Sequence, residues 1–203
     1  MRSSLRVVFA ETLALLVAAA SSAQTAAAPA GPSVETLERV VAVVDERPLL
    51  LSDVRALGAV RGLDEARALE AAIDERLMYA EASRLTQAEV RPGDEDAALA
   101  ALVAREPGLP AGVPEPDLRR LLRRQLTILK YVEFRFRPQL RITDEQVRKA
   151  WEAEEVGRPS GVPLEDAQEA LRARLERRAL DERVEAWVAE LRTRADVRLV
   201  APD

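Results

Sequence analysis

The first regular pattern along the chain is a valine-rich run followed by a short polar interruption. Four valines within residues 40–44 predict a strand that is covered on much of both faces. Residues 45–47 predict a turn of two or three residues, and residues 48–51, which open with proline, predict a second strand. Ser52 is predicted to be the N-cap of the helix that follows, with Asp53 in its first turn.

Amphipathic helices dominate the next part of the chain. Apolar residues recurring near the 3.6-residue period predict helices over residues 64–85, 94–105 and 117–136, while the proline-rich residues 107–116 predict a loop. Pro138 is expected to end the third helix. The apolar stripe of that helix is predicted to comprise Leu118, Leu122, Leu126, Leu129 and Val132.

Two more helices are predicted before the end of the chain. Thr143 opens a capping box with the glutamine three residues on, and Pro163 suits the first position of a helix over residues 164–194. In this last helix the apolar positions up to Leu175 and those from Leu180 onward point in directions about 140° apart. Its two halves are therefore expected to pack against different partners, or the helix is kinked.

The other strand-like run lies at the very end, in residues 197–200. Because a two-stranded hairpin is barely stable in water, we expect this run to join the hairpin as its third strand. The fold class predicted is mainly α, a helical module with a small β-sheet formed by the N-terminal hairpin and the C-terminal strand.

The beginning of the chain has the layout of an export signal. A basic start precedes an apolar run and small residues that suit cleavage after residue 23. Glu11 places a charge inside the apolar run, and an uncleaved anchor is the alternative, although the run is short for a bilayer span. We expect residues 1–23 to be a cleaved signal peptide, 24–37 a flexible leader and 38–203 the functional domain, with no stable membrane insertion after cleavage.

The composition excludes the catalytic mechanisms that depend on cysteine or histidine. The chain has no cysteine and no histidine, which excludes thiol nucleophiles, Ser-His pairs, His-containing zinc sites and an imidazole base. The adjacent carboxylates of Asp94, Glu95 and Asp96 could do acid–base work, but acidic groups also suit the first turn of a helix, which we favour. We expect a protein that is not an enzyme and has no cofactor and no metal site.

Basic residues gather in the predicted helix over residues 117–136. Arg119, Arg120, Arg123 and Arg124 would suit a nucleic-acid-binding helix. The export signal and the net charge of −5 favour instead a solvated face whose side-chain stems cover apolar neighbours. We therefore expect no nucleic-acid partner.

Four segments, in this order along the chain, resemble the SurA family of periplasmic chaperones. ERVVAVVDERPLLLSDV is similar to the opening of the mature family members, and AAIDERLMYAEASRL to their next helix. LRRLLRRQLTILKYVEFRFRPQLRITDEQVRKAWEAE resembles the helix pair that follows, and PLEDAQEALRARLERRALDERVEAWVAELRTRADVRLV the C-terminal helix and strand. The resemblance implies one chaperone domain with a helical part over residues 38–156 and a C-terminal helix and strand over residues 163–200.

The chain departs from that family at one place. Family members usually carry one or two parvulin-type prolyl isomerase domains between the last two segments, where this chain has only residues 157–163. No domain of roughly 100 residues fits there. The parvulin active site usually relies on histidines, and this chain has none. The resemblance therefore implies the chaperone module without the isomerase.

These features predict an ATP-independent periplasmic holdase for unfolded, outer-membrane polypeptides. Four of the chain's aromatic residues are candidates for lining its client groove, although ordinary core is the alternative for them: Tyr131, Phe134, Phe136 and Trp151. Trp187 is expected in the core in either case. The rival hypothesis is an exported helical adaptor that binds one folded partner. A prolyl isomerase is the third hypothesis, and the sequence favours it least.

Overall fold

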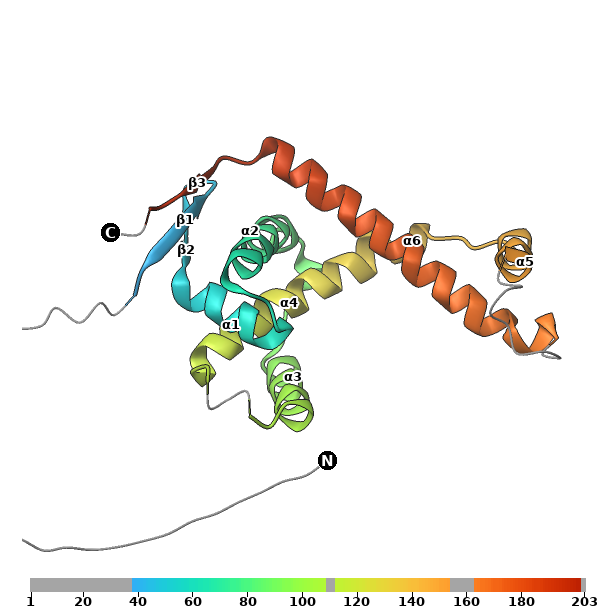
Figure 1. Ribbon diagram of the computed structural model, residues 1–203, viewed down its shortest axis with the longest axis horizontal. Coiled ribbons are helices and arrows are strands. Elements are labelled where there is room, and N and C mark those ends of the chain that lie inside the picture. The colour runs from blue at the N-terminus through green and yellow to red at the C-terminus, as the bar shows by residue number, and fades with distance from the viewer. Residues whose placement is uncertain (1–37, 109–111, 154–162, 202–203) are drawn as a thin grey trace, which may run out of the picture. The chain divides into compact units, whose positions relative to one another are not determined.

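The valine-rich run forms the first strand of a small antiparallel sheet. The computed structural model describes residues 38–108, 112–153 and 163–201, so the predicted signal peptide and leader lie outside the described residues. Strand β1 (Val40–Val44) pairs with β2 (Arg47–Leu50) on one side and with β3 (Val197–Leu199) on the other, as Figure 1 shows. The predicted third strand is confirmed, and the fold is mainly helical with this one small sheet among the described residues.

The terminal strand is held mainly by its backbone. β3 runs antiparallel to β1, with Val197 opposite Val44, and the Val200 N–H donates to the Val41 carbonyl at 3.0 Å. Val44 is 1% exposed, whereas every side chain of β3 is exposed. The strand therefore stabilises the sheet through ladder hydrogen bonds more than through side-chain burial.

The hairpin turn has two residues, the shorter of the two predicted lengths. It comprises only Asp45 and Glu46, with φ angles of 46° and 65°, because Arg47 already pairs with Val44 in the ladder. A two-residue turn with both φ angles positive matches the right-handed twist of the flanking strands, whereas a two-residue turn of type I or II would splay them.

The predicted N-cap at Ser52 is wrong. Helix α1 (Leu51–Arg61) follows β2 directly, and Leu50 stands at the N-cap position without a side-chain hydrogen bond. The Ser52 N–H donates instead to the Glu38 carboxylate at 3.3 Å. Because a carboxylate from the segment before β1 supplies the acceptor, the helix start does not need the serine hydroxyl.

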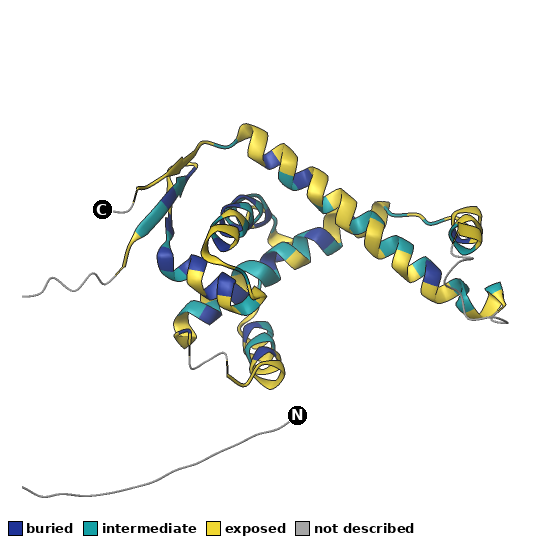
Figure 2. Cartoon of the chain, in the orientation of Figure 1, coloured by how far each residue is buried: buried dark blue, intermediate teal, exposed yellow. Residues whose placement is uncertain are grey.

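Helices α2 (Glu65–Ala82), α3 (Pro92–Arg105) and α4 (Glu115–Arg135) build the core together with α1. The 3₁₀ turn η1 (Thr86–Ala88) lies against α4, which also packs on α1, α2 and α3. The largest fully buried side chains of this core come from the sheet, α1 and α4: Val44, Val54, Leu57, Leu118 and Leu121. Figure 2 shows this burial concentrated where the helices face one another.

One position of the predicted α4 stripe is wrong. Leu118 and Val132 are buried as expected, but Leu129 is 53% exposed. The neighbouring Ile128 packs against the core in its place. α4 itself ends at Arg135, and a 3₁₀ turn, η3 (Arg137–Gln139), follows it around Pro138.

The last two helices confirm the predicted change of face. α5 (Asp144–Ala153) begins with the predicted capping box, in which the Thr143 N–H donates to the Gln146 side chain at 2.8 Å. α6 (Leu164–Arg194) packs on α5 and on α2. Arg172, in its first half, pairs with Asp144 of α5, and Arg192, in its second half, pairs with Asp74 of α2. Pro163 is the N-cap of α6 and not its first residue. The predicted short connection lies outside the described residues, except for Pro163.

Candidate functional site

Three aromatic rings gather where the end of α4 meets α6. Tyr131 stacks on Trp187 with ring centroids 4.9 Å apart, and Phe136 meets Trp187 edge-on at 5.4 Å. Tyr131 and Phe136 also make a T-shaped pair at 6.0 Å. Trp187 is 7% exposed, which confirms its predicted place in the core. Such offset and edge-to-face contacts fix the distance between two helices that otherwise touch little.

The four candidate groove residues differ in exposure. Phe136 is buried in the aromatic cluster at 5% exposure. Tyr131 and Trp151 are half-buried, the first on α4 and the second on α5. Phe134 is 52% exposed at the end of α4. Phe134 is therefore the candidate that offers most of its ring to a ligand.

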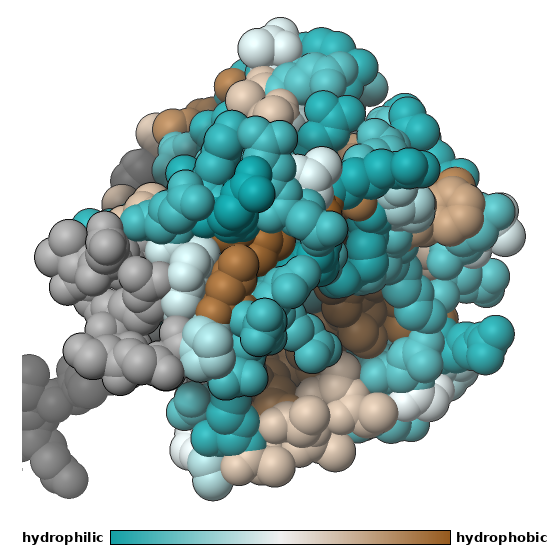
Figure 3. Space-filling model, turned by 90° about the vertical axis from the view of Figure 1, so that its right-hand side faces the viewer, coloured by the Kyte–Doolittle hydropathy of each residue, from teal (hydrophilic) through white to brown (hydrophobic). Residues whose placement is uncertain are grey.

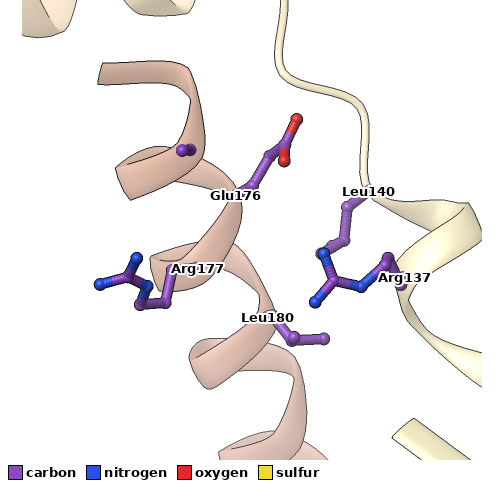
Figure 4. A pocket seen from close by; sticks show the side chains of 6 residues that line it. Arg137, Leu140, Glu176, Arg177 and Leu180 are labelled. Carbon is purple, nitrogen blue, oxygen red and sulfur yellow. The ribbon is translucent and has the colours of Figure 1, made fainter. Parts of the chain in front are cut away.

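A pocket of about 350 Å³ opens between α6 and the segment that follows α4. In Figure 4, Leu140 and Leu180 extend toward one another across it, and Arg137 lies beside Leu140. The rest of the lining comes from α6: Ala173, Glu176 and Arg177. This combination of an apolar interior and charged edges can take one apolar side chain of a ligand.

A second pocket, of about 230 Å³, follows farther along α6. One wall is the aromatic cluster, and the guanidinium of Arg183 lies 5.5 Å from the Phe136 ring centroid in a cation–π contact. Its other lining residues are Glu81, Arg135, Ala186, Glu190 and Arg194. We call the two pockets together the α6 groove.

The surface around these helices has apolar hollows under a polar rim. Figure 3 views the molecule from the side that lies at the right of Figure 1, where α5 and the first half of α6 are. Hydrophobic side chains show at the bottom of the hollows, and hydrophilic ones surround them. Apolar surface that is recessed in this way is typical of sites that bind a ligand without exposing a broad apolar patch.

The predicted solvated arginine face on α4 is wrong for Arg124. Its side chain is only 12% exposed, and it donates to Glu75 on α2 at 2.8 Å and to Asp53 on α1 at 3.1 Å. Both carboxylates are buried, and Arg76 pairs with Asp53 at 3.6 Å. Two largely buried cations and two buried anions thus join three helices.

The two arginines of this cluster stay charged despite their burial. Burial alone lowers the pKa of Arg124, but the attraction and hydrogen bonds of Glu75 and Asp53 outweigh it and raise that pKa above its ordinary value. Burial lowers the pKa of Arg76, and repulsion from Arg124 adds to the effect while Asp53 opposes it. An arginine remains protonated in either case, so both guanidinium groups are charged at physiological pH.

The other arginines of the predicted face are also engaged. Arg123 donates to the buried Glu95 on α3 at 2.8 Å, and Arg119 binds Asp96 at 2.7 Å. Arg120 donates to Asp117 at 2.6 Å. The pairs of Arg123 and Arg119 attach α4 to α3, whereas that of Arg120 lies within α4. Together they leave little free positive charge for a polyanion on this face.

One spacing in the sequence could have revealed the buried arginine. Arg124 lies three residues after Leu121 and four before Ile128, both of which face the core. A charged residue at that spacing is on the buried face of the helix. Its acidic partners, however, lie 49 and 71 positions away, so the pairing itself has no local signal.

No known protein-family model matches the sequence, and no curated protein matches it. Among the described residues, no group of acidic side chains could hold a metal ion. Within the same residues, every helix is too short or too polar to cross a membrane.

Proposed function

We propose that the protein is an ATP-independent periplasmic chaperone that holds unfolded, extended polypeptides, outer-membrane proteins among them. The order of the four segments that resemble the SurA family supports this proposal. The first and last of these segments contribute the strands of one sheet, as expected of a single module.

The observation that carries the proposal is the α6 groove. It combines apolar side chains such as Leu140 and Leu180 with aromatic rings and a charged rim. A holdase needs apolar recesses that accept many segments weakly, and flexible charged side chains at their edges allow such varied contacts. By binding the unfolded chain, it lowers the free concentration from which aggregates grow.

We also propose that the protein acts without catalysis. Neither a prolyl isomerase nor an ATP-driven cycle is needed for holding, and the absence of histidine from the sequence favours this. A protease-coupled assay on a proline tetrapeptide should show only the uncatalysed rate, whose barrier is about 18–20 kcal/mol. Acceleration in proportion to pure protein would contradict the proposal.

The proposed location depends on the signal peptide. Mass spectrometry of the protein recovered from a Gram-negative periplasm should find a mature chain that starts near Gln24. A full-length chain in the cytoplasm would argue against export.

The decisive assay is suppression of aggregation. Several unrelated unfolded outer-membrane proteins are diluted from urea with and without the protein, and light scattering is followed. A holdase should protect more than one of them. An exported adaptor, the rival proposal, should protect none and should instead bind one folded partner.

A further inference from the structure

We propose that the second pocket of the α6 groove binds carboxylates of the client, so that the protein favours extended segments in which Asp or Glu adjoins apolar residues. This inference rests on the proposed holding function and names the class of segment that the groove takes.

The acidic residues of this pocket already have partners. Glu81 pairs with Arg84 at 3.2 Å, and Glu190 pairs with Arg194 at 3.5 Å. These two carboxylates therefore do not neutralise the other two arginines of the pocket, Arg135 and Arg183.

Two arginines provide the surplus charge. Arg135 on α4 and Arg183 on α6 line the same pocket and are exposed. In the part of the chain that the structure describes, neither has an ion pair with a carboxylate, and Arg183 lies over the Phe136 ring. A guanidinium held in this way keeps N–H groups available for a carboxylate, which it can bind through two parallel hydrogen bonds.

The basic pocket contrasts with the rest of the molecule. The whole chain carries a net charge of −5, so long-range attraction would favour basic ligands, whereas the pocket favours acidic ones. The apolar recess around Leu140 and Leu180 lies next along α6. From residue 173 to residue 194 the helix rises about 32 Å, which is the length of about ten residues of extended chain. One extended segment can therefore meet both pockets.

The test uses the full-length mature protein and fluorescently labelled ten-residue peptides. One peptide alternates Leu with Asp, a second alternates Leu with Lys, and binding is followed by anisotropy at low and high salt. We expect about tenfold tighter binding of the Asp peptide at low salt, since two exposed ion pairs together supply an effect of that size. This preference should shrink at high salt because of screening.

Paired variants locate the preference. Arg135→Glu with Arg183→Glu should abolish or reverse it, while Arg55→Glu with Arg61→Glu, an equal charge change at exposed sites on α1, should keep it. Circular dichroism checks that both variants fold. Equal affinity for the two peptides, tighter binding of the Lys peptide, binding of neither, or an unchanged preference in the groove variant would overturn this inference. Aggregation suppression is scored separately, and its failure beside a retained Asp preference would overturn the holding function alone.

Discussion

Asp45 and Asp196, which are 151 positions apart in the sequence, bind each other through two hydrogen bonds. The Asp45 N–H donates to the Asp196 carbonyl at 2.9 Å, and the Asp196 N–H donates to the Asp45 carboxylate, also at 2.9 Å. The first bond extends the ladder between β1 and β3 by one residue. The second uses a side chain of the hairpin turn to fix the point where the chain leaves α6 and enters β3.

Deleting residues 196–203 should therefore destabilise the whole domain. The deletion removes the backbone hydrogen bonds of β3, each worth about 0.5–1.5 kcal/mol, and uncovers the buried edge of β1. We expect a loss of about 3 kcal/mol in the free energy of unfolding, together with weaker aggregation suppression. Thermal unfolding followed by circular dichroism measures the first effect.

Deletion of residues 201–203 alone is the matched control. It leaves β3 and its pairing with β1 in place, so its melting temperature should equal that of the full chain. If the longer deletion also melts like the full chain, β3 contributes nothing to stability, and the case for the module weakens with it.

Glu46→Gly should stabilise the protein. Glu46 has a φ angle of 65°, a conformation that costs an L-residue roughly 1–2 kcal/mol and that glycine adopts freely. Part of this gain is offset by the greater entropy of glycine in the unfolded chain, so we expect about 0.5–1 kcal/mol.

A urea titration measures the gain. Arg47→Gly, one position on, is the matched control and should destabilise, because Arg47 is the first residue of β2, already paired with Val44, and glycine is disfavoured in strands. A lower midpoint for Glu46→Gly than for the natural chain would contradict the turn geometry.

The sequence predicted best those features whose partners are local or whose pattern is periodic. The valines of β1, the Thr143–Gln146 capping box and the two faces of α6 are all readable because residue type and spacing determine them. The union of β3 with β1 was predictable only because a hairpin needs a third strand. The N-cap prediction for Ser52 is wrong because Glu38, which lies outside the helix, accepts the hydrogen bond from the helix start.

The candidate site is harder to predict from the sequence than the fold, because tertiary contacts form it. Phe134 and Phe136 are two residues apart. No local sequence pattern predicts that Phe136 is buried in the aromatic cluster while Phe134 is exposed. Leu140 and Leu180 form one pocket from segments far apart in the chain. The sequence predicts a surface position for the charge of Arg124, because its two carboxylate partners are remote in the chain.

Arg124→Ala should be strongly destabilising. The substitution leaves the Asp53 and Glu75 side chains, which are 5% and 3% exposed, without their main cation. Breaking a buried pair in this way costs about 3–5 kcal/mol. Arg178→Ala is the control, since Arg178 and Glu182 are 77% and 63% exposed and such pairs contribute about 0.5 kcal/mol or less.

Urea unfolding of the two variants separates the alternatives. Equal, small losses for Arg124→Ala and Arg178→Ala would mean that the buried cluster is solvated in solution. A much larger loss for Arg124→Ala would show that the three helices it joins depend on it.

The pair Phe134→Ala and Phe136→Ala distinguishes client binding from core packing. Phe136 is 5% exposed and packs on Trp187, so its truncation leaves a cavity and should cost about 3–5 kcal/mol of stability. Phe134 is 52% exposed, so its truncation should change stability by less than about 1 kcal/mol. If Phe134 contacts clients, the same variant should need several-fold more protein to suppress aggregation, even though its melting temperature is unchanged. Loss of suppression only in proportion to lost stability, in both variants, would exclude Phe134 from the client surface and leave the α6 groove as the remaining candidate.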